Sequence, residues 1–300
     1  MHIDRHGVWG WPRILATALT AAMRVCAMLV VATAPLQAQE RGSPKRIVSL
    51  DLCTDQILVE LVGRERIAAV THLAADPSVS AIPAKAKGIP FTHGAAEDVL
   101  RYDPDLILAG PFGVSATVNL LRRLKRTVVV VPQPPDLEAV RAAVRMVAAA
   151  VGEGPKGETM IAAFDRRLAG LNPPTGTAPP TAIIYQVGGS VSGPGSLAEA
   201  VLVAAGFRNK AAEYRLTRNG QVPLELLVAA PPDLLVLSSA VDEYRTAIAD
   251  NLRHPVLKRL RQRHASLQLP WQLWLCGTPN IAEAIERLAD ARSKLAARAR

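Results

Sequence analysis

Hydrophobic and polar positions divide this chain into two alternating kinds of segment. From Arg46 onward, short runs of consecutive apolar residues, rich in Val, Ile and Leu, alternate with stretches whose apolar residues recur at helical spacing. Continuous apolar runs are typical of strands buried on both faces, and the stretches between them are typical of covering helices. The pattern therefore predicts an α/β fold with mostly parallel sheets.

The first half of the chain reads as one α/β lobe that ends near Pro132-Gln133-Pro134-Pro135. A residue with a short polar side chain commonly caps a helix start, and Thr54 or Asp55 is the expected cap of the first helix. The predicted elements are strands at 47–50, 67–70, 106–109 and 127–131, and helices at 55–61 and 116–124.

The middle of the chain, 136–171, has the longest helical pattern. Pro155 suits the first turn of a helix that runs to Leu171, about 25 Å at the standard rise per residue. Beyond a Pro-rich loop the β/α pattern resumes, with strands at 182–185, 234–237 and near Leu267, and a closing helix from Thr278-Pro279. A helix of this length between two β/α regions predicts a strut.

A repeated motif indicates that the two β/α regions are similar lobes. Glu97 is followed after six residues by Pro104-Asp105-Leu106, and Glu225 is followed after six residues by Pro232-Asp233-Leu234. In both copies a short helix ends before the proline and leads into an apolar strand. The predicted organisation is a signal peptide at 1–38, an N-terminal α/β lobe at 45–153, a linking helix at 154–172 and a C-terminal α/β lobe at 180–300, with a ligand cleft between the lobes.

Composition and charge narrow the classes of function. The net charge of +9 suggests a polyanionic partner, but the basic residues are dispersed and accompany no nucleic-acid-binding motif. Nucleic acid is therefore not an expected partner. A basic start, an apolar run at 25–32 and the small-residue exit Leu36-Gln37-Ala38 predict a cleavable export signal, translated from Met1 or Met23. The apolar run is too short to span a membrane, so we expect an exported, non-embedded protein, in the periplasm of a bacterium with two membranes.

Motifs of enzymes and metal sites do not occur at the expected spacing. The sequence has no P-loop, no dinucleotide fingerprint and no nucleophile elbow. The histidines of the mature chain form no pair at metal-site spacing, so no metal site and no cofactor are expected. Two cysteines remain after the leader, Cys53 and Cys276; in an oxidising compartment they form either a disulfide or two buried thiols, and the sequence leaves both open.

Ligands of α/β proteins bind outside the carboxyl ends of the strands, and that rule selects a candidate binding set. Its members are mostly neutral, partly aromatic and partly polar, which suits a bulky, rigid, mostly apolar ligand. Core packing is the stronger expectation for Tyr185, which lies inside a strand. The set comprises Leu52, Cys53, Thr54, His72 and Phe112 from the first lobe and Tyr185, Gln186, Ser239, Trp271 and Trp274 from the second.

These motifs resemble the class III periplasmic binding proteins of ABC importers, which capture cobalamin and ferric siderophores. The resemblance rests on the opening strand 46–50 followed by Cys53-Thr54-Asp55-Gln56, on both Glu-x6-Pro-Asp-Leu motifs, and on Tyr185-Gln186-Val187-Gly188. It implies two lobes joined by one long helix, with a ligand between them. Catecholate-siderophore binders place arginines in that cleft, and Arg215 and Arg245 are the candidates here.

The resemblance also implies a role for the repeated glutamates, because members of this family dock on the permease through one surface glutamate on each lobe. Glu97 and Glu225 occupy these positions. The predicted function is the monomeric, periplasmic, substrate-binding component of an ABC importer, which captures a metal chelate (a ferric siderophore or cobalamin) and delivers it to the permease. The alternatives are a receptor for free zinc or manganese and an exported α/β enzyme.

Overall fold

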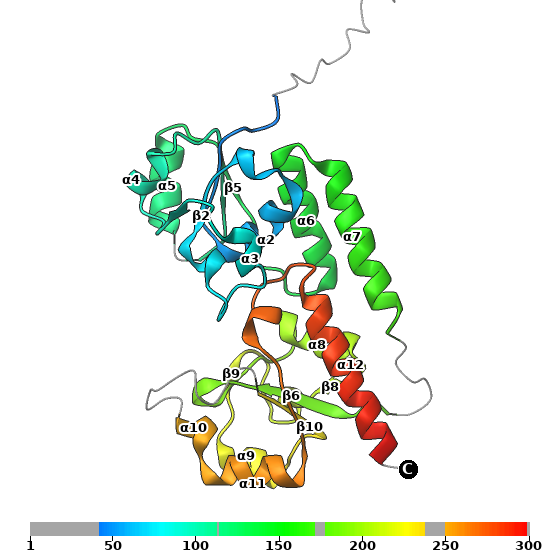
Figure 1. The fold of residues 1–300 in the computed structure, drawn as a ribbon. Helices are drawn as coiled ribbons and strands as arrows, with labels where there is room; N and C mark the ends of the chain where they lie inside the picture. The colour runs from blue at the N-terminus through cyan, green and yellow to red at the C-terminus, as the bar shows by residue number, and fades with distance from the viewer. Residues whose placement is uncertain (1–41, 113, 172–177, 238–249, 299–300) are drawn as a thin grey trace, which may run out of the picture. The chain divides into compact units, whose positions relative to one another are not determined.

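The protein is described by a computed structural model over residues 42–112, 114–171, 178–237 and 250–298 (Figure 1). Residues 43–300 form one compact unit, which contains two sheets, each covered by helices on both faces. The expectation of an α/β fold with two mostly parallel sheets is confirmed.

The first sheet has five parallel strands in the order β3-β2-β1-β4-β5. Alternate residues of β1 enter opposite cores: Ile47 packs with α2, α3 and α6, and Val48 packs with α4 and α5. Its elements are β1 (Ile47–Ser49), α2 (Leu52–Leu61), β2 (Ile67–Thr71), α3 (Pro83–Ala86), β3 (Phe91–Thr92), α4 (Ala96–Leu100), β4 (Leu106–Ala109), α5 (Ser115–Arg123) and β5 (Val128–Val130).

The second sheet is mixed. Strands β11, β10, β6 and β8 run parallel, and the two-residue strands β7 and β9 add antiparallel pairs at one side. Helices α8 and α12 cover one face, and α9, α10 and α11 cover the other. Its elements are β6 (Thr181–Tyr185), β7 (Ser190–Val191), α8 (Leu197–Ala204), β8 (Arg208–Asn209), β9 (Gly220–Gln221), α9 (Leu224–Ala229), β10 (Leu234–Leu237), α10 (Asp250–Arg253), α11 (Pro255–Arg263), β11 (Ala265–Gln268) and α12 (Ile281–Arg298).

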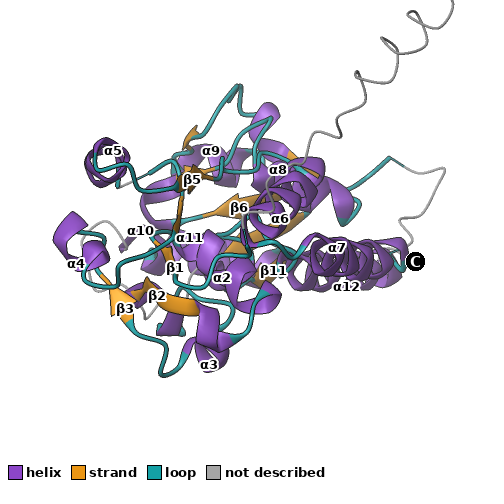
Figure 2. Cartoon of the chain, turned by 90° about the horizontal axis from the view of Figure 1, so that it is seen from above, coloured by secondary structure: helices purple, strands orange, loops and turns teal. Residues whose placement is uncertain are grey.

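Two antiparallel helices, α6 (Leu137–Val151) and α7 (Gly154–Ala169), lead from the first sheet to the second (Figures 1 and 2). Gly152 adopts a left-handed φ of 75° at the end of α6, and Pro155 lies in the first turn of α7. Along α7, Ile161 packs into the first core and Phe164 packs into the second. The helix therefore contributes to the cores of both lobes.

The aspartate of the repeated motif has the same structural role in both lobes. The carboxylate of Asp105 accepts hydrogen bonds from the backbone N–H groups of Lys45 (2.7 Å) and Arg46 (3.0 Å), just before β1. The carboxylate of Asp233 accepts from the backbone N–H and the hydroxyl of Thr181, the first residue of β6, at 2.7 Å each. Each aspartate thus satisfies the first donors of the neighbouring strand and helps to fix the strand pairing.

Candidate functional site

A cavity of about 440 Å³ opens at the carboxyl ends of the first-lobe strands. Its size lies in the usual range for ligand pockets, and its place follows the rule for open α/β sheets. Large apolar side chains lie at its edge, with Phe112 67% exposed and Leu73 37% exposed. The described lining comes from the segments 50–54, 71–73, 92–94, 111–112 and 131–134 and from Ile57, Val114 and Ala143 of the first lobe, and from Leu275, Cys276 and Gly277 of the second.

Asp51 brings a carboxylate to this apolar cavity. It caps α2, and its Oδ1 accepts from the backbone N–H groups of Cys53 (2.9 Å) and Thr54 (3.2 Å). Burial raises the pKa of Asp51, and these two hydrogen bonds oppose the shift. Gly110 makes room for the carboxylate, because a Cβ at Gly110 would lie 2.3 Å from Asp51 Oδ2. The expectation that Thr54 or Asp55 caps this helix is therefore wrong, since the helix begins at Leu52.

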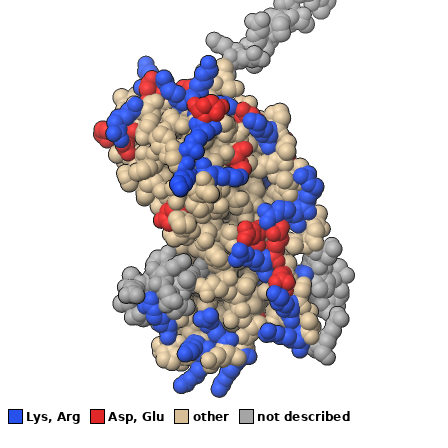
Figure 3. Space-filling view, viewed as in Figure 1, with Lys and Arg blue, Asp and Glu red and all other residues tan. Residues whose placement is uncertain are grey.

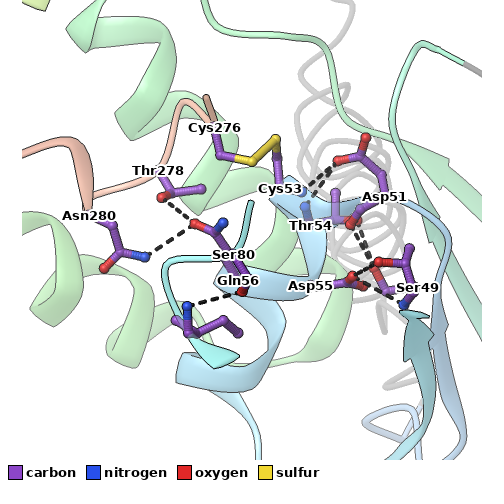
Figure 4. Close-up of a disulfide and its surroundings, with 12 residues drawn as sticks. Ser49, Asp51, Cys53, Thr54, Asp55, Gln56, Ser80, Cys276, Thr278 and Asn280 are labelled. Carbon is purple, nitrogen blue, oxygen red and sulfur yellow. Dashed lines mark hydrogen bonds between the residues drawn. A yellow bond between two sulfur atoms is a disulfide. The ribbon is translucent and has the colours of Figure 1, made fainter. Parts of the chain in front are cut away.

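Because α2 begins three residues earlier than predicted, Asp55 lies inside the helix and is fully buried (Figure 4). Its Oδ2 accepts from the Thr71 hydroxyl at 2.6 Å and from the Thr71 backbone N–H at 3.1 Å. Burial raises the pKa of Asp55 to about 8, despite these hydrogen bonds. Asp55 therefore carries its proton at neutral pH, and its hydrogen-bond partner Thr71 lines the cavity.

Two imidazoles meet at the cavity edge. His72 follows β2 and His93 follows β3, and because these strands are neighbours in a parallel sheet, both rings emerge at the same edge. Their ring centroids are 4.6 Å apart, and the ring of Phe91 lies edge-on to His93 at 5.6 Å. Neutral imidazole is a common metal ligand, so this pair can bind a metal presented at the cavity mouth.

A covalent bond joins the two lobes beside the cavity. Cys53 in the first turn of α2 and Cys276 before α12 form a disulfide, so of the two alternatives left open by the sequence the structure contains the disulfide (Figure 4). One helical turn further along α2, Gln56 Oε1 accepts from Thr278 Oγ1 (3.1 Å) and from Asn280 Nδ2 (3.3 Å). The start of α2 is therefore fastened to the turn before α12 by both covalent and polar contacts.

The cavity brings together the first-lobe half of the predicted set. Leu52, Cys53, Thr54, His72 and Phe112 all line it. Asp51 was not selected from the sequence. It follows an apolar strand directly and is of a residue type that commonly caps helices, so the sequence did offer a reason to select it. His93 was not selected either, because the pairing of β2 with β3 is not visible in the sequence.

The second-lobe half of the set, as far as the structure describes it, lies outside the lining of this cavity. Tyr185 is 1% exposed, in the core between β6 and α9, where its hydroxyl donates to Val222 O at 3.2 Å. Trp274 is 7% exposed and packs against α8 and α12, and Trp271 is partly buried against the same core. Large aromatic surfaces gain more from core burial than from a loop position, so these three side chains do not line the cavity.

Four further predicted residues are polar. Gln186 and the exposed Arg215, which has a left-handed φ of 62°, are not among the residues that line the cavity. Ser239 and Arg245 lie outside the described residues. Within the described lining there is no lysine or arginine.

Comparison with known proteins identifies relatives of the whole described fold. Residues 47–261 match the family model described as "Periplasmic binding protein". A cobalamin-binding protein of Halobacterium salinarum is 26% identical over 206 residues, which cover 67% of this chain and 56% of the relative. The chain thus spans little more than half the length of that curated relative.

Solved structures share the fold at low identity. The apo form of the periplasmic heme-binding protein RhuT from Roseiflexus sp. RS-1 superposes with a TM-score of 0.67 at 24% identity, covering 84% of this chain and 100% of that one. The vitamin B12-binding protein BtuF of Vibrio cholerae gives a TM-score of 0.61 at 17% identity, covering 84% and 98%. These similarities establish a common two-lobed architecture.

Proposed function

Because the chain belongs to the periplasmic binding protein family, we propose that it is the substrate-binding component of an ABC importer and that it captures a bulky metal chelate of the corrinoid type, without net negative charge. The observation that carries the proposal is the first-lobe cavity, whose described lining is mostly apolar and presents two imidazoles at its edge.

The charge of the cavity selects among metal chelates. The described lining has one carboxylate, that of Asp51, and no lysine or arginine. A triply charged catecholate siderophore, or a tetrapyrrole that turns carboxylates inward, would lack a counter-charge there and would be repelled by Asp51. A corrinoid carries amide side chains, which can donate hydrogen bonds to a carboxylate. The curated relative from H. salinarum is named a cobalamin-binding protein, which supports this choice.

The imidazole pair distinguishes among the metal chelates that carry no net negative charge. A ferric hydroxamate is neutral but has no free position on its metal, whereas aquocobalamin has an exchangeable axial water that an imidazole can replace. His72 and His93 line the cavity and their rings are exposed, so an imidazole nitrogen is available to a metal that enters there. Several solved neighbours are titled heme-binding proteins, so heme is the second candidate to be tested.

We infer export and delivery from other parts of the chain. Residues 1–38 have the pattern of a cleavable signal, and no helix within the described residues is long and apolar enough to cross a membrane. Glu97 and Glu225 are exposed in the first turns of α4 and α9, without an ion pair among the described residues. Two unpaired acids on a rigid scaffold can be met by two arginine forks of a permease.

The test uses the mature chain and several probes: aquocobalamin, cyanocobalamin, hemin, a ferric trihydroxamate, a ferric tricatecholate and zinc chloride. We expect aquocobalamin to raise the melting temperature in a concentration-dependent manner, since a ligand at 100 times its Kd stabilises by about 2.7 kcal/mol. Its absorption spectrum should shift as imidazole replaces water. Cyanocobalamin, whose axial position is blocked, should bind without that shift.

Substitutions then separate the metal ligand from the cavity. His72→Ala with His93→Ala should abolish the spectral shift and retain binding of cyanocobalamin. The matched control is His254→Asn, which keeps the hydrogen-bond acceptor that caps α11 and lies far along the chain from the cavity. The proposal would be refuted in favour of a metal receptor if only zinc stabilised the protein, and in favour of a heme carrier if only hemin did. Recovery of a chemically altered ligand would refute it in favour of an enzyme.

A further inference from the structure

A second large cavity lies in the C-terminal lobe, at the amino ends of the parallel strands of the second sheet. It encloses about 660 Å³ and is lined by residues directly before β6, β10 and β11, which run parallel and begin at this edge. The site is therefore formed by the amino ends of the strands, by the end of α11 and by the last turns of α12. It does not overlap the first-lobe cavity.

The charges that line this groove are unbalanced. Three arginines, Arg263 from α11 and Arg292 and Arg298 from α12, line the groove together with one carboxylate, that of Asp233. His264, between α11 and β11, adds an imidazole. That carboxylate is held by the N–H and the hydroxyl of Thr181 at 2.7 Å each, so it is oriented toward the strand start.

The surrounding surface adds positive charge. Helix α11 contains no acidic residue, and its exposed Lys258, Arg259, Arg261 and Arg263 make no ion pair within the part of the chain that the structure describes. Figure 3 shows Lys and Arg side chains gathered over the end of the molecule where Figure 1 has α11, with few acidic atoms among them.

Basic residues on other helices of the protein are paired with carboxylates. On α6 and α7, Arg141 pairs with Asp165 at 2.6 Å, and Arg145 pairs with Glu158 at 2.8 Å. On α12 itself, Arg287 pairs with Glu283 at 2.6 Å. Arg298 has no such partner among the described residues, and the groove holds three arginines and one carboxylate, that of Asp233. A local excess of this kind attracts anions, and guanidinium groups favour phosphate oxygens through paired hydrogen bonds.

Arg292 has a structural role that limits what it contributes to this site. Its side chain is buried, and Nη1 donates to Ala205 O at 2.9 Å, at the C-terminal end of α8. It satisfies a helix-terminal carbonyl and anchors α12 to α8. The argument for a ligand therefore rests on Arg263 and Arg298, which are exposed, and on His264.

The rest of the groove is apolar and rigid. Pro179, Pro180, Pro231 and Pro232 form one wall, and Leu295 and Ala296 form another. Beyond Gly206 the surface continues into a further hollow of about 380 Å³, which shares Pro179 and Gly206 with the groove. That hollow contains an apolar side chain, Val203, 58% exposed on α8, together with the charged residues Glu199 and Arg208. The prolines and Val203 give the cationic groove an apolar side, which suits an anion that carries an apolar body.

We propose that this groove binds a phosphate-bearing amphiphile, with its phosphate between Arg263, His264 and Arg298 and its apolar part along the proline wall toward Val203. The phosphate chemistry could come from an anionic phospholipid or from a free phosphate, and the groove volume and the apolar wall favour the lipid. The proposal does not depend on the ligand of the first-lobe cavity.

Calorimetric titration of the mature, ligand-free chain in 0.15 M salt, at which exposed charges are screened beyond about 8 Å, tests the proposal. The probes are monomeric dihexanoylphosphatidylglycerol, dihexanoylphosphatidylcholine with the same chains and no net charge, and inorganic phosphate. We expect phosphatidylglycerol to bind at least tenfold more tightly than either of the others. Equal binding of the two lipids, or binding of inorganic phosphate as tight as that of phosphatidylglycerol, would overturn the proposal.

Charge-matched variants separate the groove from the net charge of the protein. Arg263→Gln with Arg298→Gln should weaken phosphatidylglycerol binding at least tenfold. The control, Arg122→Gln with Arg123→Gln, removes the same two charges from the exposed end of α5 in the other lobe and should leave binding unchanged. Both pairs are exposed, so folding should be retained, which circular dichroism verifies. Equal loss in both double variants, or no binding by the unmodified chain, would refute the site.

Discussion

The disulfide between Cys53 and Cys276 should contribute a large share of the stability of this protein. The perturbation is its removal, either by a reductant or by Cys53→Ser with Cys276→Ser. For a sequence separation of 223 residues, the chain-entropy relation gives about 18 cal/mol/K, which is about 5 kcal/mol at 25 °C. Measured effects usually fall below this relation, so we expect a loss of about 2–5 kcal/mol.

Urea unfolding followed by circular dichroism measures the effect, since stability falls linearly with denaturant and the midpoint reports the change. The unmodified chain is compared with and without reductant, and the serine variant is carried through both conditions. We expect the reduced chain and the variant to share a lower midpoint, with a melting temperature lower by on the order of 10 °C. The variant should not respond to reductant, which controls for effects of the reductant itself.

Two results would refute the reasoning. A change below about 1 kcal/mol would mean that the cross-link does not restrict the unfolded chain as the entropy relation requires. A loss in the serine variant without a loss in the reduced chain would mean that side-chain packing at Cys276, which is 2% exposed, causes the effect instead of the bond.

The remaining predictions concern protonation and docking. Because burial raises the pKa of Asp55 to about 8, the folded state holds a proton that the unfolded state releases above about pH 4, so stability should fall as the pH rises from 4 to 8. Urea unfolding of Asp55→Asn at pH 5 and 9 should no longer show that fall, and a steeper fall in this variant would contradict the reasoning. Asp98→Asn removes a carboxyl whose pKa is lowered, so it should cost stability at neutral pH and little at acid pH. Glu97→Ala with Glu225→Ala should preserve ligand affinity and abolish cellular uptake, with exposed Glu65→Ala as the control; loss of ligand binding in the double variant would contradict a docking role.

The framework of the fold was predictable because local and global preferences agree along much of the chain. The strand β10 begins just after Pro232, and the helix α7 begins at Gly154-Pro155. Proline and glycine limit where an element can begin whatever the tertiary surroundings, so these two boundaries were predictable. The two-residue strands β7 and β9 were not predicted, since such pairs depend on where the tertiary structure places neighbouring backbone. In a strand of that length, no periodicity exists to be recognised.

The start of α2 shows a different limit. Asp51, Thr54 and Asp55 all have side chains that cap helices, so the sequence allowed the helix to begin at any of three places. A shift of three residues changes Asp55 from a cap into a buried carboxyl and brings the carboxylate of Asp51 to the cavity. The packing of Trp271 and Trp274 against the second core was not predictable for a related reason, because a loop position does not determine which side of the loop faces the core.

The connections between the lobes bear on how the cavity is used. Cys53 is bonded to Cys276, Gln56 accepts hydrogen bonds from the turn before α12, and Arg167 near the end of α7 pairs with Glu286 on α12 at 2.7 Å. The covalent bond and the hydrogen bonds join the start of α2, which lines the cavity, to the segment that supplies Leu275–Gly277 to the same lining. A large separation of the lobes at this point would require breaking a covalent bond. The cavity should therefore be largely pre-formed, so that little binding energy is spent on closing it. If the protein has the proposed function, we expect the ligand to leave through the side of the cavity at His72 and Phe112.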